Sequence, residues 1–263
     1  MNTPPQPVEE TSPPAGPPEP TLSLLARLVN VFAVPGEVFD DVRSSRASAA
    51  NWLVPALLTA LVGTLAAIVM FSQPAIQQQV REQQEKAIEE RVQAGKLSRA
   101  QADQALAVME RFTGPRMMIA LGTLGAVVNG FVRCFGWGLV LWLLGRWVLK
   151  ARFDYMKAVE VAGLAGMIAV LGALVTLLLI VNVGSLFSRP SLALAVEDFD
   201  VKKPGHLLLG AANLFTFWHV AVMSVGLARL AGVPWARALL IMFSFWLLWT
   251  LALVFSGVGQ MAL

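Results

Sequence analysis

The chain has 263 residues, of which 56% are hydrophobic and only 14% are charged, and its mean hydropathy is +0.64. A soluble domain carries about 25% charged residues, so this composition excludes an ordinary soluble fold and indicates an integral membrane protein. The formal net charge is +3, but the basic residues are spread over the connecting segments, which argues against a nucleic-acid-binding patch.

The N-terminal segment differs in composition from the rest of the chain. Residues 1–20 contain eight of the fifteen prolines and hardly any large apolar side chain. Such a segment cannot bury enough apolar surface to fold, so we expect a disordered, solvated arm.

Residues 21–45 predict two short amphipathic helices. In the first, apolar residues recur at three- and four-residue spacing and Arg27 lies off their stripe, which consists of Leu22, Leu25, Val29 and Phe32. Thr21 is the expected N-terminal cap. Two arrangements fit this pattern: the helix pair lies on the membrane surface, or it packs against the transmembrane bundle.

Five apolar segments are long enough to cross a hydrocarbon core of about 30 Å. They comprise residues 52–71, 117–145, 159–183, 207–230 and 238–258. The predicted fold class is therefore all-α, a polytopic membrane protein with a five-span domain over 46–258 and a short tail over 259–263. The turns 146–157 and 231–237 are compact and basic, which favours a cytoplasmic N-terminus.

The connection between the first two spans, residues 73–116, is rich in charge and glutamine. Apolar residues at helical spacing run up to Gly95, and Ser98 with Gln101 fits a capping box that starts a second helix. We predict an extramembrane helical hairpin with a solvated surface.

Small residues recur every four positions along the second predicted span. They are Gly122, Ala126, Gly130, Cys134 and Gly138. Such a stripe lets another helix approach closely, either within the chain or in a homodimer. Cys134 has no partner cysteine in the sequence and is interpreted as a small packing residue.

Arg133 is the charged residue that lies deepest in a predicted span. It shares a helix face with Asn129, and a polar site in the bundle would combine these two with Asn213 and His219. In a hairpin folded about the 146–157 turn, Arg133 faces residues near 170, whereas Glu160 lies about 15 Å away. The alternative is a structural arginine whose side chain extends toward an interface.

No catalytic, cofactor or metal motif is recognisable. His206 and His219 are not accompanied by acids or cysteines at ligand spacing, and no P-loop, Ser-His-acid arrangement or paired intramembrane carboxylates occur. We therefore expect a protein that is not an enzyme and that has no cofactor.

Three stretches carry a family resemblance. Residues 28–42, LVNVFAVPGEVFDDV, contain Pro35 and Phe39; residues 153–167 read FDYMKAVEVAGLAGM; and residues 213–238 contain Phe215, Trp218 and Gly226. Over about residues 22–257 the chain resembles the prokaryotic branch of the Yip family, Ypt- and Rab-interacting membrane proteins.

The resemblance implies a five-span bundle in the bacterial inner membrane with a cytoplasmic N-terminus. It also implies a non-catalytic role in membrane organisation or in the recruitment of membrane or peripheral proteins, with the lipid bilayer as the constant partner. The alternative is a transporter or channel subunit that uses the polar site around Arg133 and His219.

Overall fold

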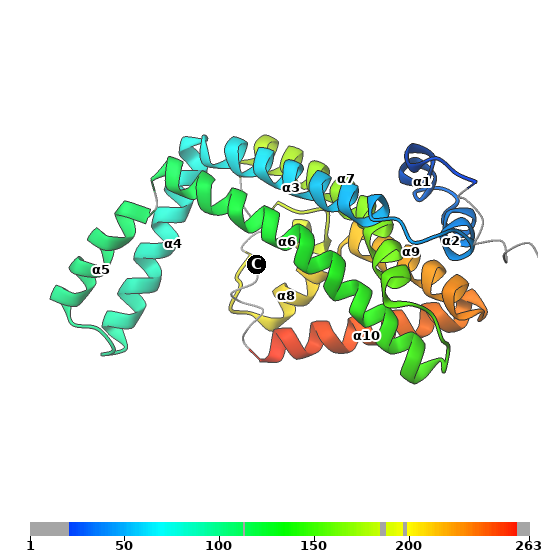
Figure 1. Cartoon of the computed structure of the whole chain (residues 1–263). Helices are drawn as coiled ribbons and strands as arrows, with labels where there is room; N and C mark the ends of the chain where they lie inside the picture. Colours follow the sequence, from blue (N-terminus) through cyan, green and yellow to red (C-terminus); the bar gives the residue numbers. More distant parts are fainter. Residues whose placement is uncertain (1–20, 113, 185–187, 197–198, 257–263) are drawn as a thin grey trace, which may run out of the picture.

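The computed structural model describes residues 21–112, 114–184, 188–196 and 199–256 (Figure 1). These residues form helices and contain no β-strand, apart from an isolated bridge between Ser191 and Asn213. The expected arm over 1–20 and the expected tail over 259–263 lie outside the described residues.

Five helices of the described part are long and apolar enough to cross a membrane, which confirms the all-α polytopic fold class. They are α3 (Ala50–Phe71), α6 (Pro115–Leu143, continued by the π-helical turn Leu144–Val148), α7 (Tyr155–Val183), α9 (Leu214–Ala231) and α10 (Trp235–Phe255). Helix α3 packs on α6 and α7, α7 packs on α9, and α9 packs on α10.

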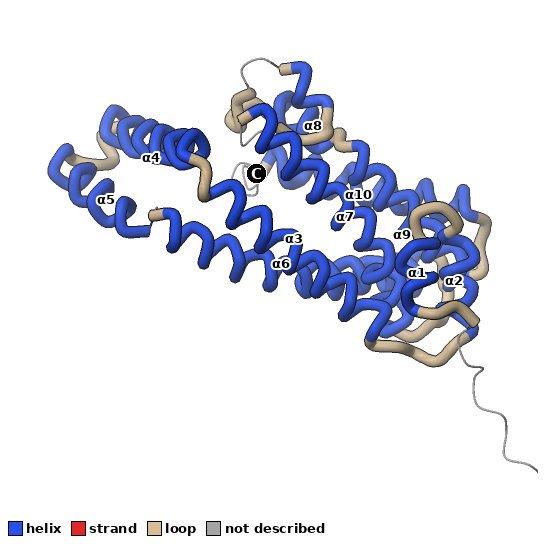
Figure 2. Tube along the Cα trace, turned by 90° about the horizontal axis from the view of Figure 1, so that it is seen from above, coloured by secondary structure: helices blue, strands red, loops and turns tan. Residues whose placement is uncertain are grey.

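The two ends of this bundle carry different structures. At one end α4 (Pro74–Gln93) and α5 (Arg99–Phe112) project from α3 and α6, and at the other end α1 (Leu24–Asn30) and α2 (Pro35–Ser44) cover the helix ends (Figures 1 and 2). Gly95, at φ 68°, closes α4, and Ser98 and Gln101 exchange the two hydrogen bonds of the predicted capping box.

The predicted start of the fourth span at 207 is wrong, because the helix is interrupted. Residues Pro204–Ala211 form a separate short helix, α8, and α9 begins only at Leu214. The cause is Asn213, whose side chain accepts hydrogen bonds from the backbone N–H groups of Phe215 and Thr216. This cap starts a new helix and ends the apolar run that the sequence presents as continuous.

Helix α1 is turned differently from the sequence prediction. Half of its expected inner stripe faces outward, since Leu25 is 71% and Val29 58% exposed, whereas Arg27 is 3% exposed. The other two members, Leu22 and Phe32, are half-buried and pack against the core. The N-cap is Ser23, which accepts from the Ala26 N–H, and not Thr21. Of the two arrangements considered for the α1–α2 pair, the structure shows packing against the bundle, and α2 buries Val38 and Phe39 completely.

The small residues of α6 are used within the chain. They lie against small or backbone groups of α3 and α7: Gly122 on Ala67, Ala126 on Gly63, Gly130 on Ala56 and Gly138 on Val159. Cys134 is buried, with its sulfur 3.7 Å from the Val159 carbonyl oxygen. A second copy of the chain would therefore have to bind through another surface.

A close backbone approach brings α7 against the start of α3. A Cβ atom at Gly163 would lie 2.5 Å from Trp52 Cα and 2.7 Å from the Asn51 carbonyl oxygen. Both neighbours belong to the backbone and cannot rotate away. Glycine at this position therefore sets the separation of α3 and α7.

The substitution Gly163→Ala should destabilise the protein by about 1–3 kcal/mol, because overpacking forces the two helices apart. Gly166→Ala is the matched control on the same helix, since a Cβ there meets no atom within 4 Å. Thermal unfolding in detergent measures both variants. An equal response of the two variants would contradict the assigned contact.

Candidate functional site

A buried polar network joins the α1–α2 pair to the first turns of α3 and α7. We call it the anchor network; its members are Arg27, Asp41, Ser45, Asn51, Lys157 and Glu160. Arg27, Asp41, Asn51 and Glu160 are each at most 7% exposed. Polar groups buried to this degree require partners, and here each group finds them in another segment of the chain.

Arg27 lies at the centre of the anchor network. Its Nε donates to Asp41 Oδ2 at 2.9 Å, and its two terminal nitrogens reach Asn51 Oδ1 at 3.0 Å and Ser45 Oγ at 3.3 Å. Asp41 also accepts from the backbone N–H and hydroxyl of Thr21, both at 2.8 Å. The planar guanidinium thereby fixes α1, α2 and α3 relative to one another.

Asn51 connects the two charged halves of the anchor network. Its side-chain oxygen accepts from Arg27, and its Nδ2 donates to Glu160 Oε2 at 2.5 Å. An amide offers both an acceptor and a donor, which neither a carboxylate nor an apolar side chain provides. Glu160, which lies in α7 and is 0% exposed, is thus linked to a residue 109 positions earlier.

Lys157 attaches the start of α7 to the end of α2. Its Nζ donates to the carbonyl oxygens of Val42 at 2.7 Å and Ser45 at 2.8 Å, and lies 3.2 Å from Glu160 Oε1. The last carbonyls of a helix have no partner within the helix and carry partial negative charge. The Lys157 ammonium group donates hydrogen bonds to these carbonyl oxygens and so fixes the orientation of α2.

The anchor network is electrically balanced. Two cations, Arg27 and Lys157, face two carboxylates, Asp41 and Glu160, so burial leaves no uncompensated charge. Burial alone raises the pKa of Asp41, but the hydrogen bonds from Thr21 and Arg27 and the charge of Arg27 outweigh it and hold that pKa below the usual 3.8.

Sequence reasoning did not identify the anchor network, because its partners are far apart in the chain. Two local signals were present: a lysine and a glutamate three residues apart at the start of an apolar span, Lys157 and Glu160, and an asparagine directly before Trp52. Neither pattern identifies the residue with which these side chains interact. The pairing becomes visible only when α1 is placed over the ends of α3 and α7.

Of the predicted intramembrane polar site, three residues come together and one does not. Arg133, Asn213 and His219 line a cavity of about 440 Å³ between α6, α7, α9 and α10, which we call the Arg133 cavity. Asn129 is exposed on α6 and does not line it. The residues of α7 at the cavity include Ala169 and Gly172, near the predicted position 170.

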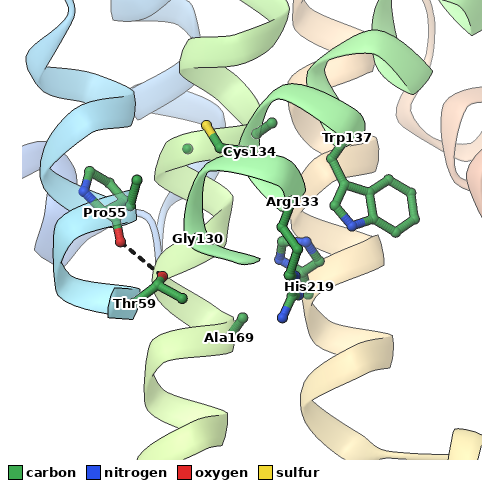
Figure 3. Close-up of a pocket in the computed structure, with 12 residues that line it drawn as sticks. Pro55, Thr59, Gly130, Arg133, Cys134, Trp137, Ala169 and His219 are labelled. Atoms are coloured by element: carbon green, nitrogen blue, oxygen red, sulfur yellow. Dashed lines mark hydrogen bonds between the residues drawn. The ribbon is translucent and has the colours of Figure 1, made fainter. Parts of the chain in front are cut away.

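His219 is held by one of its two ring nitrogens. Its Nδ1 donates to the Ala165 carbonyl oxygen at 2.9 Å, and the ring meets Trp137 edge-on at 6.0 Å between centroids. The other nitrogen, Nε2, is buried and has no hydrogen-bond partner among the described residues. In Figure 3 the Arg133 side chain runs alongside this imidazole.

Arg133 itself has no ion-pair or hydrogen-bond partner among the described residues. An arginine at the centre of a membrane-spanning helix costs roughly 2.5–3.5 kcal/mol on the insertion scale. Glu160, the carboxylate of α7, is not its partner, because Glu160 interacts with Asn51 and Lys157 in the anchor network. Within the described part of the chain, no group of His, Cys, Asp and Glu residues forms a metal site.

The chain matches the model of the Yip1 domain over residues 29–257. The chain belongs to the Yip1 family. This family comprises membrane proteins linked to membrane trafficking. No curated protein and no solved structure matches the chain significantly.

In this Yip1 domain the residues that carried the resemblance form two separate contacts. Pro35 opens α2, and Phe39 from α2 lies against Gly226 of α9, where an added Cβ would approach the Phe39 ring to 3.3 Å. Trp218 stacks on Phe215 at 6.3 Å between ring centroids. Of these contacts, the one between Phe39 and Gly226 joins α2 to α9, and the one between Phe215 and Trp218 lies within α9.

Replacing Asp41 with asparagine should destabilise the Yip1 domain by about 3 kcal/mol, because Arg27 then remains buried without a counter-charge. Asp40→Asn is the matched control, since Asp40 forms an ion pair with Arg229 in which both side chains are more than 40% exposed. Such exposed pairs contribute about 0–1 kcal/mol. Similar losses of thermal stability in the two variants would refute the assignment.

The stabilisation by Asp41 should also depend on pH. Because the folded-state pKa is lowered, the contribution is fully present above the usual value of 3.8 and is lost as pH falls through the folded-state value. The melting-temperature difference between wild type and Asp41→Asn should stay constant from about pH 7 to 5 and shrink below about 3.8. A difference that disappears near neutral pH would contradict this.

Proposed function

We propose that the protein is a non-catalytic member of its family that recruits a partner protein at the membrane through the α1–α2 pair. The observation that carries this proposal is the outward apolar stripe of α1. Leu25 and Val29 are 71% and 58% exposed, and Val34, between the two helices, is 40% exposed. An exposed apolar patch on a rigid support is typical of an interaction surface.

The anchor network makes this support rigid. Rotating α1 to hide Leu25 and Val29 would expose Arg27 and break its bonds to Asp41 and Asn51. The stripe is therefore kept outward by buried hydrogen bonds and does not depend on a partner for its orientation. Because the surface is already ordered, this protein loses little conformational entropy when a partner binds.

The α4–α5 hairpin offers a second surface of different chemistry. It projects from the bundle (Figures 1 and 2), and most of its described side chains are polar and exposed. Its link to the rest of the chain includes an ion pair between Glu90 and Lys202. We infer that this hairpin contributes specificity on the opposite side of the membrane.

The proposed setting is the inner membrane of a bacterium, with the α1–α2 pair in the cytoplasm, as in the prokaryotic branch. Support comes from the basic residues at that end of the bundle. Arg43 donates to the Arg229 carbonyl, and the turn after α6 carries Arg146, Lys150 and Arg152. Compact basic turns at span ends favour the cytoplasmic side.

The double variant Leu25→Ser and Val29→Ser tests the proposal. A photo-crosslinking residue at position 34 should capture a reproducible protein from native membranes, and the double variant should reduce that product severalfold. Leu57→Ser with Leu61→Ser is the matched control, because these residues are 52% and 55% exposed on α3. Crosslinks that are unchanged in the α1 variant would overturn the proposal.

The second candidate function is a transporter or channel subunit, and the Arg133 cavity is the observation that favours it. Against it, the same helices continue toward α1–α2 with Leu141, Met223 and Met242, which are all 0% exposed. These three apolar side chains fill that side of the bundle and argue against a polar path there. Flux into liposomes that responds to Arg133→Leu would support transport, and no flux change would remove this candidate.

A further inference from the structure

The Arg133 cavity has a polar part that the proposed recruitment does not use. Arg133 is exposed there without an ion-pair or hydrogen-bond partner among the described residues, and the buried His219 Nε2 likewise lacks one. His219 is 5% exposed. A fixed cation beside an unpartnered nitrogen, both inside a membrane-spanning bundle, indicates an anionic ligand that also carries a hydrogen-bonding group.

The cavity is large enough for the polar end of a lipid. Its volume of about 440 Å³ lies in the range of ligand sites, and hydroxyl groups of Thr216 and Thr250 belong to its lining. Because His219 Nδ1 donates to Ala165, the neutral ring presents a lone pair at Nε2. That nitrogen can accept from a hydroxyl of a headgroup.

An apolar groove shares Arg133 with the cavity. It has a volume of about 310 Å³ and runs between α6 and α10, where Gly136, Trp137, Val140, Phe245 and Trp249 line it. Position 136 has no side chain, and a Cβ there would meet no atom within 4 Å. The combination of a cationic end and an apolar groove matches a molecule with an anionic headgroup and an acyl chain.

Arg133 lies well inside the bundle, about 27 Å along α6 from Pro115 at the hairpin end and about 15 Å from Leu143 at the other end. Trp249, which lines both the groove and the cavity, lies about 21 Å along α10 from Trp235 and about 9 Å from the helix end at Phe255. Side chains on a helix lean toward its N-terminus, and the N-terminus of α6 lies at the hairpin end. The guanidinium therefore extends from this depth toward the hairpin side, from which a headgroup would enter the cavity.

We propose that the Arg133 cavity binds an anionic phospholipid. Its phosphate pairs with Arg133, a headgroup hydroxyl donates to His219 Nε2, and one acyl chain occupies the groove along Gly136. The charge of Arg133 is then compensated by the bilayer, as the charges of the anchor network are compensated within the protein. The site is independent of the α1 stripe.

Native mass spectrometry of the full chain in a neutral detergent tests this, with phosphatidylglycerol and phosphatidylethanolamine as the added lipids. Wild type should bind phosphatidylglycerol preferentially, and Arg133→Gln should weaken it at least tenfold. Arg116→Gln is the matched control, because it removes an exposed arginine from the same helix. Equal binding by wild type and Arg133→Gln, or equal loss in both variants, would overturn the proposal.

A second variant tests the groove without changing charge. Gly136→Leu should fill the space between α6 and α10 and weaken phosphatidylglycerol at least fivefold, whereas Gly125→Leu, also at an open position of α6, should leave it unchanged. Glycerol 3-phosphate, which lacks acyl chains, should not displace the lipid. Displacement by glycerol 3-phosphate together with unchanged binding in Gly136→Leu would identify a small-anion site and refute the lipid assignment.

Discussion

The contact of two Arg27 nitrogens with Asp41 Oδ2, extended through Asn51 to Glu160 and Lys157, is the constraint on which the exposed surface of the protein depends. It joins segments that the chain separates by more than a hundred residues at one end of the bundle. Its charges balance, so it can be buried at low cost in free energy, but removal of any charged member leaves its partner uncompensated. The orientation of α1, and with it the outward stripe of Leu25 and Val29, follows from this arrangement.

The sequence was sufficient for those features that depend on local pattern. The number of spans and the capping box at Ser98 follow from hydropathy and cap chemistry, which act over one helix at a time. The inner face of α1 was predicted wrongly at Leu25 and Val29, because periodicity ranks Leu25 above Arg27 for burial and takes no account of a carboxylate fourteen residues away. The break at Asn213 was missed because the apolar run continues on both sides of the cap.

In the candidate sites, too, local features could be predicted from the sequence and long-range pairings could not. A polar group around Arg133 could be suspected from one charge in an apolar segment, but its partners depend on the register of α6 against α3 and α7, which small residues such as Gly130 and Gly138 determine. That register places His219 at the cavity and leaves Asn129 outside it. Within the described part of its membrane domain the protein thus has two polar sites, one satisfied within the chain and one open, and we propose that the open one binds a ligand from the bilayer.

Hydrogen–deuterium exchange of residues 24–44 in wild type and Asn51→Leu tests the central claim most directly, because Leu removes the bridge between Arg27 and Glu160 while keeping the size of the side chain. The account predicts that the backbone amides of α1 and α2 exchange at least tenfold faster in the variant, with α9 and α10 unchanged. Equal protection of residues 24–44 in the two proteins would show that apolar packing alone holds the α1–α2 pair, and would contradict the account.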